Sequence, residues 1–201
     1  MNNNINIQST NNYNWKITIY NIRDLNDNYK LNIINQWIIY NDFDFTVLTE
    51  TKLKPNYKSR FNLNNYKYTA YYDSSEIHTY NKEVAIIIKN TWSKHIESIT
   101  KYKERLLHLV LKFKGKKIIH ILGCYTPALT TKEDKKEVKK ISKYISNILS
   151  KNKTTIIARD INKDYHHYNK NIIKYSITTN ILSKGMINTY SYSDQKTNKY
   201  T

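Results

Sequence analysis

The chain has 201 residues and a formal net charge of +17 at pH 7, because 33 lysine and arginine residues outnumber 16 aspartate and glutamate residues. Its length suits one hydrophobic core, and only 3 glycines and 2 prolines argue against flexible linkers between domains. A single cysteine, Cys124, excludes an intrachain disulfide, and no apolar run approaches the roughly 20 residues that a membrane-spanning helix needs.

The N-terminal segment 1–14, MNNNINIQSTNNYN, has no apolar core and no basic lead, so it is not a secretory signal, and we expect a disordered polar tail. A strand is predicted at 15–20, WKITIY. A helix is predicted at 29–41, capped by Asp27 or Asn28. Its apolar positions fall on one face: Leu31, Ile34, Trp37 and Ile38.

Six further segments are predicted as strands because β-branched and aromatic residues dominate them: 43–51, 66–72, 83–89, 95–100, 105–113 and 117–125. The last two are joined by a hairpin turn around Gly115. Pro127 then ends the extended segment. Thr130 with Glu133 forms a capping box for a helix. The apolar face of that helix holds Val138, Ile141, Ile145, Ile148 and Leu149. A strand at 154–159 and a weaker helix at 169–183 follow.

The order of these elements predicts an α/β domain with mixed sheets, since several strands follow one another without a helix between them. An all-parallel nucleotide-binding fold is excluded by the same succession of strands, and the sequence has no glycine loop for phosphate.

The positive charge favours a polyanionic partner, nucleic acid first and an anionic membrane surface second. The lysines are scattered, with short clusters in KFKGKK (112–117) and KEDKKEVKK (132–140). A solvated basic surface is the plainer alternative. A codon bias toward Asn, Lys, Ile and Tyr would also contribute lysines without function.

Polar residues stand at the ends of four predicted strands: Asn21, Glu50, Tyr125, and Asp160 with Asn162. Strand ends are held rigidly by the sheet while their loops stay open, so functional groups concentrate there. Two carboxylates with amides and a phenol suit hydrolysis of a phosphate ester with a divalent metal. Each residue taken alone is also compatible with an ordinary strand terminus.

The order and spacing of five motifs are more specific. They are ITIYNIRDLN, FTVLTETKL, EVAIIIK, RLLHLVLKFKGKKIIHILGCYTP and TIIARDIN. Together they resemble the endonuclease/exonuclease/phosphatase superfamily over residues 15–201, and in particular the apurinic-type endonuclease domain of LINE-type retrotransposons. The resemblance implies a four-layered α/β sandwich, in which two mixed sheets pack face to face with helices outside.

The resemblance also implies roles for the five strand-end residues. Glu50 would hold the metal, Mg²⁺ or alternatively Mn²⁺, and Asn21 would support the metal site and the phosphate. Tyr125 would contact the scissile phosphate, Asp160 would orient or deprotonate the attacking water, and Asn162 would position that water or the phosphate oxygens. The implied partner is nucleic acid, in the first place DNA. No membrane and no obligate protein partner is expected, and the location is intracellular, in nucleus or cytoplasm.

Several positions depart from the superfamily pattern. Arg159 replaces the usual glycine before the catalytic aspartate, and we expect its charge to pair with Asp160 and compete with the metal. Thr49 stands where relatives often have glutamine. The chain stops at KTNKYT, before the final Asp-His pair of the family, so we expect a domain incomplete at its C-terminus.

Three functional hypotheses follow. The first is a Mg²⁺-dependent phosphodiester hydrolase acting on DNA, derived from a retrotransposon and weakened or inactive in this chain. The second is a catalytically dead remnant that binds nucleic acid through its basic surface. The third is a phosphatase or lipid phosphodiesterase of the same superfamily, for which the sequence offers no lipid-binding insertion.

Overall fold

A computed structural model describes residues 5–8, 14–53, 67–72, 84–126, 131–151 and 154–161, with only the backbone at 5–8, Asn14 and Ile161. Two compact units are present. The first comprises Met1–Tyr125 with Thr154–Asp160, and the second comprises Thr126–Lys153 with Ile161–Thr201. Within the described ranges, no helix combines the length and apolarity needed to cross a membrane.

The first sheet has five strands in the order β1-β2-β3-β5-β4. Their bounds are β1 Ile5–Gln8, β2 Asn14–Asn21, β3 Phe45–Thr49, β4 Tyr68–Tyr72 and β5 Val84–Lys89. β2 and β3 run parallel and are connected by helix α1 (Asn28–Asn41), whereas the other neighbours pair antiparallel. The sheet is therefore mixed.

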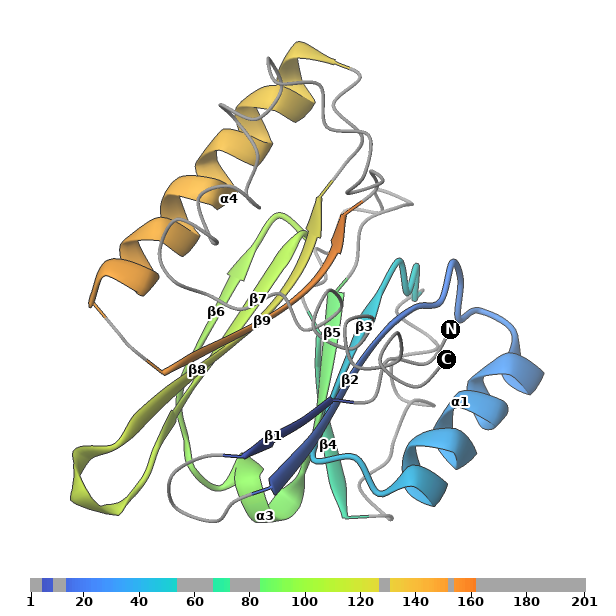
Figure 1. The fold of residues 1–201 in the computed structure, drawn as a ribbon. Helices are drawn as coiled ribbons and strands as arrows, with labels where there is room; N and C mark the ends of the chain where they lie inside the picture. Colours follow the sequence, from blue (N-terminus) through green and yellow to red (C-terminus); the bar gives the residue numbers. More distant parts are fainter. Residues whose placement is uncertain are drawn as a thin grey trace, which may run out of the picture. The chain divides into compact units, whose positions relative to one another are not determined.

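The second sheet has four strands in the order β6-β7-β8-β9. Their bounds are β6 Ile96–Tyr102, β7 Leu106–Lys112, β8 Ile118–Thr126 and β9 Thr155–Ile161. β6, β7 and β8 form an antiparallel meander. β9 runs beside β8 in the same direction (Figure 1), and the His120 N–H donates to the Thr154 carbonyl at 3.1 Å. This sheet is mixed as well.

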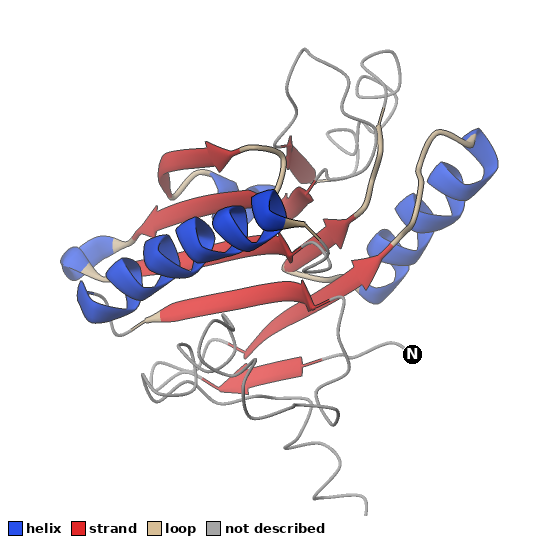
Figure 2. Ribbon diagram, turned by 90° about the horizontal axis from the view of Figure 1, so that it is seen from above, coloured by secondary structure: helices blue, strands red, loops and turns tan. Residues whose placement is uncertain are grey.

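The two sheets pack face to face (Figure 2), and alternate side chains of β2, β3, β5, β7 and β8 fill the core between them. β5 contributes Val84, Ile86 and Ile88 to the core between the sheets, and β7 contributes Leu107, Leu109 and Leu111. All six are at most 1% exposed. The predicted α/β fold with two facing mixed sheets is confirmed.

Gly123 of β8 lies where the two sheets approach each other closely. A Cβ atom there would lie 2.8 Å from Cγ1 of Val84 and 3.0 Å from Cγ1 of Val47, on the opposite sheet. Contacts under 3.0 Å require a neighbour to move, and these neighbours are buried core side chains. Only glycine lets the two sheets meet at this point.

Helix α1 covers the outer face of the first sheet. Its buried side chains Leu31, Ile34 and Ile38 join a second core cluster with Leu48 and Ile87 of the sheet. Asp27 caps the helix, since its carboxylate accepts from the Tyr29 N–H, as predicted. Trp37 is partly buried, and its ring packs against the rings of Tyr20 and Phe43 at 5.8 and 4.9 Å between centroids.

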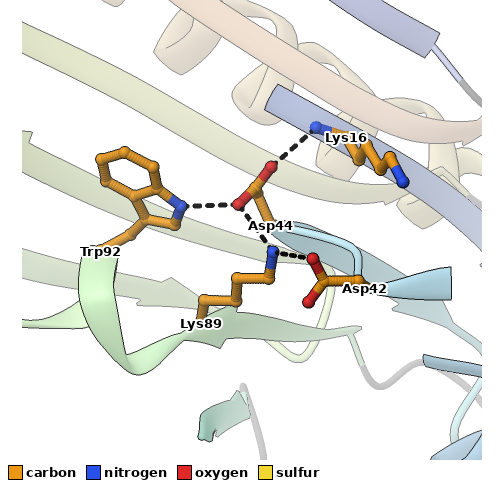
Figure 3. A network of polar contacts seen from close by, with 5 residues as sticks. All are labelled: Lys16, Asp42, Asp44, Lys89 and Trp92. Carbon is orange, nitrogen blue, oxygen red and sulfur yellow. Dashed lines mark hydrogen bonds and ion pairs between the residues drawn. The ribbon is translucent and has the colours of Figure 1, made fainter. Parts of the chain in front are cut away.

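Asp44 organises a polar network at the start of β3 (Figure 3). Its carboxylate accepts from the Lys16 N–H at 2.8 Å and from Trp92 Nε1 at 2.8 Å, and it pairs with Lys89 Nζ at 3.2 Å. Lys89 also pairs with Asp42 at 2.8 Å. Trp92 lies in the short helix α3 (Asn90–Ser93) that follows β5. The network therefore ties β2, β3 and β5 together at one end of the first sheet.

Two local expectations are corrected. The tail expected at 1–14 includes strand β1, which pairs with β2 because Ile5 and Ile7 alternate with polar residues in a strand pattern. In the second unit, helix α4 (Lys132–Lys151) is capped one residue later than expected, since Thr131 Oγ1 accepts from the Asp134 N–H at 3.0 Å. Thr130 and the predicted helix at 169–183 lie outside the described residues.

The predicted buried face of α4 is confirmed at Val138, Ile141, Ile145 and Ile148, whereas Leu149 is half-buried. The predicted hairpin turn between β7 and β8 is also present. It contains the short helix η2 (Lys114–Lys116), and Gly115 adopts a left-handed backbone with φ of 75°.

Candidate active site

The apolar inner face of three strands ends in a polar residue at the same end of the sandwich. On β2 the inward positions Trp15, Ile17 and Ile19 lead to Asn21, because side chains on one face recur at every second residue. By the same spacing, β3 ends inward at Thr49, and β9 reaches Asp160 after Ile156 and Ala158. Strand alternation therefore places Asn21, Thr49 and Asp160 toward the space between the sheets.

The Asn21 side chain connects two carboxylates. Its Nδ2 donates to Glu50 Oε1 at 3.0 Å and also donates to Asp160 Oδ2. Its Oδ1 accepts from the Arg23 N–H at 3.0 Å, which fixes the orientation of the amide. Asp160 Oδ2 also lies 3.4 Å from Thr49 Oγ1. The structure thus brings together three of the five predicted site residues.

Glu50 reaches this position through a left-handed backbone, with φ of 55°. A non-glycine residue in this conformation costs on the order of 1 kcal/mol, so surrounding contacts must hold it. The Thr49 carbonyl accepts from the Ile22 N–H at 3.0 Å, and the Thr51 carbonyl accepts from the Leu25 N–H at 2.9 Å. These bonds join the loops that follow β2 and β3 and fix Glu50 beside Asn21.

Burial raises the pKa of the Asp160 carboxyl, and the nearby Glu50 carboxylate adds to the rise. The hydrogen bonds from Asn21 and Thr49 oppose it, because they favour the ionised form. The net shift is upward. Asp160 is consequently a stronger base than a carboxylate in water, which suits a group that accepts a proton.

Tyr125 occupies the next inward position on β8 after Gly123, and its ring packs against the core between the sheets. In a parallel pair, an N–H bonds the carbonyl of the residue just before its partner, so the bond from His120 to Thr154 pairs His120 with Thr155. Five residues further along both strands, Tyr125 lies beside Asp160. The Tyr125 N–H donates to the Arg105 carbonyl at 2.8 Å. Tyr125 therefore lies at the same end of the second sheet as Asp160, while Asn162 falls outside the described residues.

Arg159 and Asp160 are neighbours on β9 and lie on opposite faces of that strand. Successive residues of a strand point to opposite faces, so Arg159 faces away from the core that Asp160 faces. Its charge acts on Cys124 of β8: burial raises the pKa of that thiol to about 12, and Arg159 and Arg105 oppose the rise. Burial, Asn21, Glu50 and Thr49 all act on the pKa of Asp160.

The site offers oxygen ligands suited to a hard divalent cation. Glu50 Oε1 and Asp160 Oδ2 both lie next to a single amide nitrogen, so the two carboxylates converge on one point. The described part of the chain contains no cluster of three or more His, Cys, Asp or Glu side chains. Mg²⁺ commonly takes only one or two protein carboxylates and completes its shell with water and phosphate, so the residues present fit such an ion.

Sequence reasoning did not single out Thr49 or Gly123 as part of the site. Thr49 could have been found from alternation, because it stands two residues after the buried Val47 on the same strand face. No local pattern reveals Gly123, because the need for glycine comes from a neighbouring sheet.

No protein-family model and no curated protein sequence matches the chain. Solved structures do match. TDP2 from Caenorhabditis elegans has 15% identity and a TM-score of 0.55, covering 76% of this chain and 48% of its own. An AP endonuclease from Archaeoglobus fulgidus has 15% identity and a TM-score of 0.57, covering 81% and 64%.

The 3′ phosphatase NExo from Neisseria, bound to a product DNA hairpin, has 16% identity and a TM-score of 0.61, covering 84% of this chain and 70% of its own. The chain spans about half of the TDP2 structure and less than two thirds of the AP endonuclease. At these identities the likeness concerns the fold. The fold expected from the sequence motifs is confirmed at that level: the chain shares the fold of these solved structures.

Proposed function

We propose that this chain hydrolyses phosphodiester bonds in DNA with the help of a divalent cation, Mg²⁺ or alternatively Mn²⁺. The observation that carries the proposal is the convergence of the Glu50 and Asp160 carboxylates, from different sheets, on the amide of Asn21. Two carboxylates held together cost free energy unless a cation or a donor compensates them. The site residues and the superfamily fold agree on this chemistry.

Glu50 would hold the cation, with Asp160 close enough to share in binding it. When bound, a divalent ion would stabilise the negative charge that develops on the phosphate oxygens. The left-handed backbone of Glu50 and the bonds between its loop and the loop after β2 keep the carboxylate in place. Little reorganisation of the chain is then needed when ligands enter.

Asp160 would orient the attacking water and accept its proton at a carboxylate oxygen. The raised pKa of Asp160 supports this role, since a base is more effective when its pKa approaches the working pH. Asn21, held through Oδ1 by the Arg23 N–H, would keep Asp160 in position with one N–H of Nδ2. Its other N–H, which meets Glu50, would turn to a phosphate oxygen when Glu50 holds the cation. Tyr125 would contact the scissile phosphate from β8, and Asn162 would position the water or the phosphate oxygens.

A chain that binds nucleic acid without cutting it is the second candidate. It is favoured by one specific observation: the Asn21 amide already donates to both carboxylates, at the place where a cation would otherwise balance them. If this arrangement persists in solution with Mg²⁺ present, the site stays closed to the ion. The net charge of +17 supports nucleic-acid binding in either case.

The remaining parts of the proposal rest on the sequence. They are an origin in a LINE-type retrotransposon, one endonuclease-like domain over residues 15–201, an intracellular location and no obligate protein partner. The motif resemblance supports the origin and the domain. The single cysteine agrees with a reducing compartment.

Nicking of supercoiled plasmid tests the proposal. We expect nicking by the unmodified chain in Mg²⁺ or Mn²⁺ that stops in EDTA. Asp160→Asn should reduce the rate by about 10²-fold or more, because general-base catalysis typically contributes that much. Glu133→Gln is the matched control, since it converts an exposed carboxylate of α4 into an amide. Equal nicking by the unmodified chain and Asp160→Asn would contradict the proposal.

Thermal unfolding with and without Mg²⁺ separates the two candidates when nicking is absent. A chain whose site accepts the ion is stabilised by it, and that stabilisation should be lost in Glu50→Gln. Binding of DNA without any Mg²⁺-dependent stabilisation would favour the chain that binds without cutting.

A further inference from the structure

The turn between β7 and β8 forms a basic tip at the end of the second sheet opposite Tyr125 and Asp160 (Figure 1). It comprises residues 112–117, KFKGKK, and is called the hairpin tip below. The turn is closed by a bond from the Phe113 N–H to the Lys117 carbonyl at 2.9 Å. Gly115 and Lys116 both adopt a left-handed backbone, with φ of 75° and 62°. The lysines are thus carried on a defined turn.

The hairpin tip concentrates positive charge, of which the described residues neutralise only the part carried by Lys112. Lys112 pairs with Glu97 at 2.6 Å, but among the described residues Lys114, Lys116 and Lys117 have no ion-pair partner. Lys114 and Lys116 are exposed and Lys117 is half-buried. The segment 112–117 contains no acidic residue, whereas the basic segment 132–140 of α4 intersperses its lysines with Glu133, Asp134 and Glu137. Charge density is therefore higher at the hairpin tip.

Aromatic rings adjoin these lysines. The Phe113 ring lies 4.5 Å from the His95 ring and 6.2 Å from the Trp92 ring, measured between centroids. All three rings are partly exposed, and the Lys112 N–H donates to the His95 carbonyl at 2.8 Å, which holds the rings against the hairpin. Lys94, exposed beside His95, adds a further cation without an ion-pair partner among the described residues.

We propose that the hairpin tip, with Phe113, His95 and Trp92 beside it, binds a segment of single-stranded nucleic acid. Lysines beside partly exposed rings suit single strands, since the phosphates meet cations while unpaired bases stack on rings. The surface is separate from the candidate active site: the seven steps along β8 from Ile118 to Tyr125, at about 3.3 Å each, place it about 23 Å away. It does not depend on the proposed hydrolysis.

The test measures binding of fluorescent oligothymidine, oligouridine and a DNA duplex of equal length, in EDTA and at several salt concentrations. One variant combines Lys114→Gln, Lys116→Gln and Lys117→Gln. The matched control combines Lys135→Gln, Lys136→Gln and Lys139→Gln on the exposed side of α4, which removes the same charge.

We expect the hairpin variant to bind both single strands at least about 10-fold more weakly. Its slope of log K against log salt should become shallower by about 2, since each lost phosphate contact removes about 0.7. The α4 control should change affinity less than about 3-fold. Phe113→Leu, which keeps the charge, should weaken single-strand binding by about 5-fold or more and spare the duplex. Thermal unfolding of each variant confirms that it is folded.

Equal losses in the hairpin variant and the α4 control would overturn the proposal, because binding would then follow net charge alone. A larger loss for the duplex than for the single strands would overturn it too. Tighter binding of oligouridine would identify RNA as the preferred single strand, and tighter binding of oligothymidine would identify DNA. Either preference supports the proposal if the hairpin variant loses it.

Discussion

The Asn21 amide donates to the Asp160 carboxylate although the two residues are 139 positions apart and lie on different sheets. This bond joins the ends of β2 and β9 across the sandwich. The same Nδ2 donates to Glu50 at 3.0 Å, so one neutral side chain separates two acids. The candidate site depends on this arrangement for both its geometry and its electrostatics.

Asn21→Asp should destabilise the chain by about 1–3 kcal/mol at neutral pH, because a third carboxylate would replace the donor that Glu50 and Asp160 share. The loss should shrink as pH falls and the carboxylates become protonated. Urea unfolding at several pH values measures it. Asn90→Asp is the control, since Asn90 is exposed and its side-chain oxygen accepts from Thr69. Equal stability of the two variants would contradict the arrangement.

Asp160→Asn should raise the melting temperature at neutral pH while it abolishes activity. The pKa of Asp160 is higher in the folded chain than its ordinary value of 3.8, so the folded state binds a proton more readily than the unfolded state. The free energy of unfolding therefore decreases as pH rises above about 3.8 and Asp160 ionises. The variant keeps this free energy, because its amide does not ionise. The gain should disappear below about pH 3.8. A variant less stable than the parent at neutral pH would show that the charge is compensated.

Gly123→Ala should cost about 1–3 kcal/mol, because its Cβ would press on Val84 and Val47 across the sheet interface. Val84→Ala removes the atom nearest to that new Cβ. In the Gly123→Ala background it should therefore cost less stability than it costs in the unmodified chain. Gly115→Ala, where nothing lies within 4 Å, should cost only about 1 kcal/mol from its left-handed backbone. Denaturant midpoints decide the order, and a smaller loss at Gly123 than at Gly115 would contradict the close approach.

Asp44→Ala should destabilise the chain by about 3 kcal/mol, because it leaves Lys89 and the Trp92 and Lys16 N–H groups without their shared acceptor. The exposed pair of Glu97 with Lys112 gives the comparison: Glu97→Ala should cost less than about 1 kcal/mol. Thermal unfolding of both variants checks the difference. Similar losses would mean that the Asp44 network adds no more than a surface ion pair.

The sequence allowed the strands and their inward faces to be predicted because one buried core imposes a period of two. That period makes Ile17 and Ile19 lead to Asn21, and it brings Asp160 to the same core from 139 residues away. The same rule predicts that Arg159 faces the other side of β9 from Asp160. The left-handed backbone of Glu50 was not predictable, since contacts between two loops maintain it. Strand β1 escaped prediction because its segment is mostly polar.

The central claim is that Glu50 and Asp160 form one hydrolytic site. The most direct measurement is the metal-dependent nicking rate of Glu50→Gln, Asp160→Asn and the variant that combines them. Residues that act as a unit are strongly non-additive, so the combined variant should be no slower than the slower single variant. Losses that multiply would contradict a shared site, and so would single variants that nick DNA as fast as the unmodified chain.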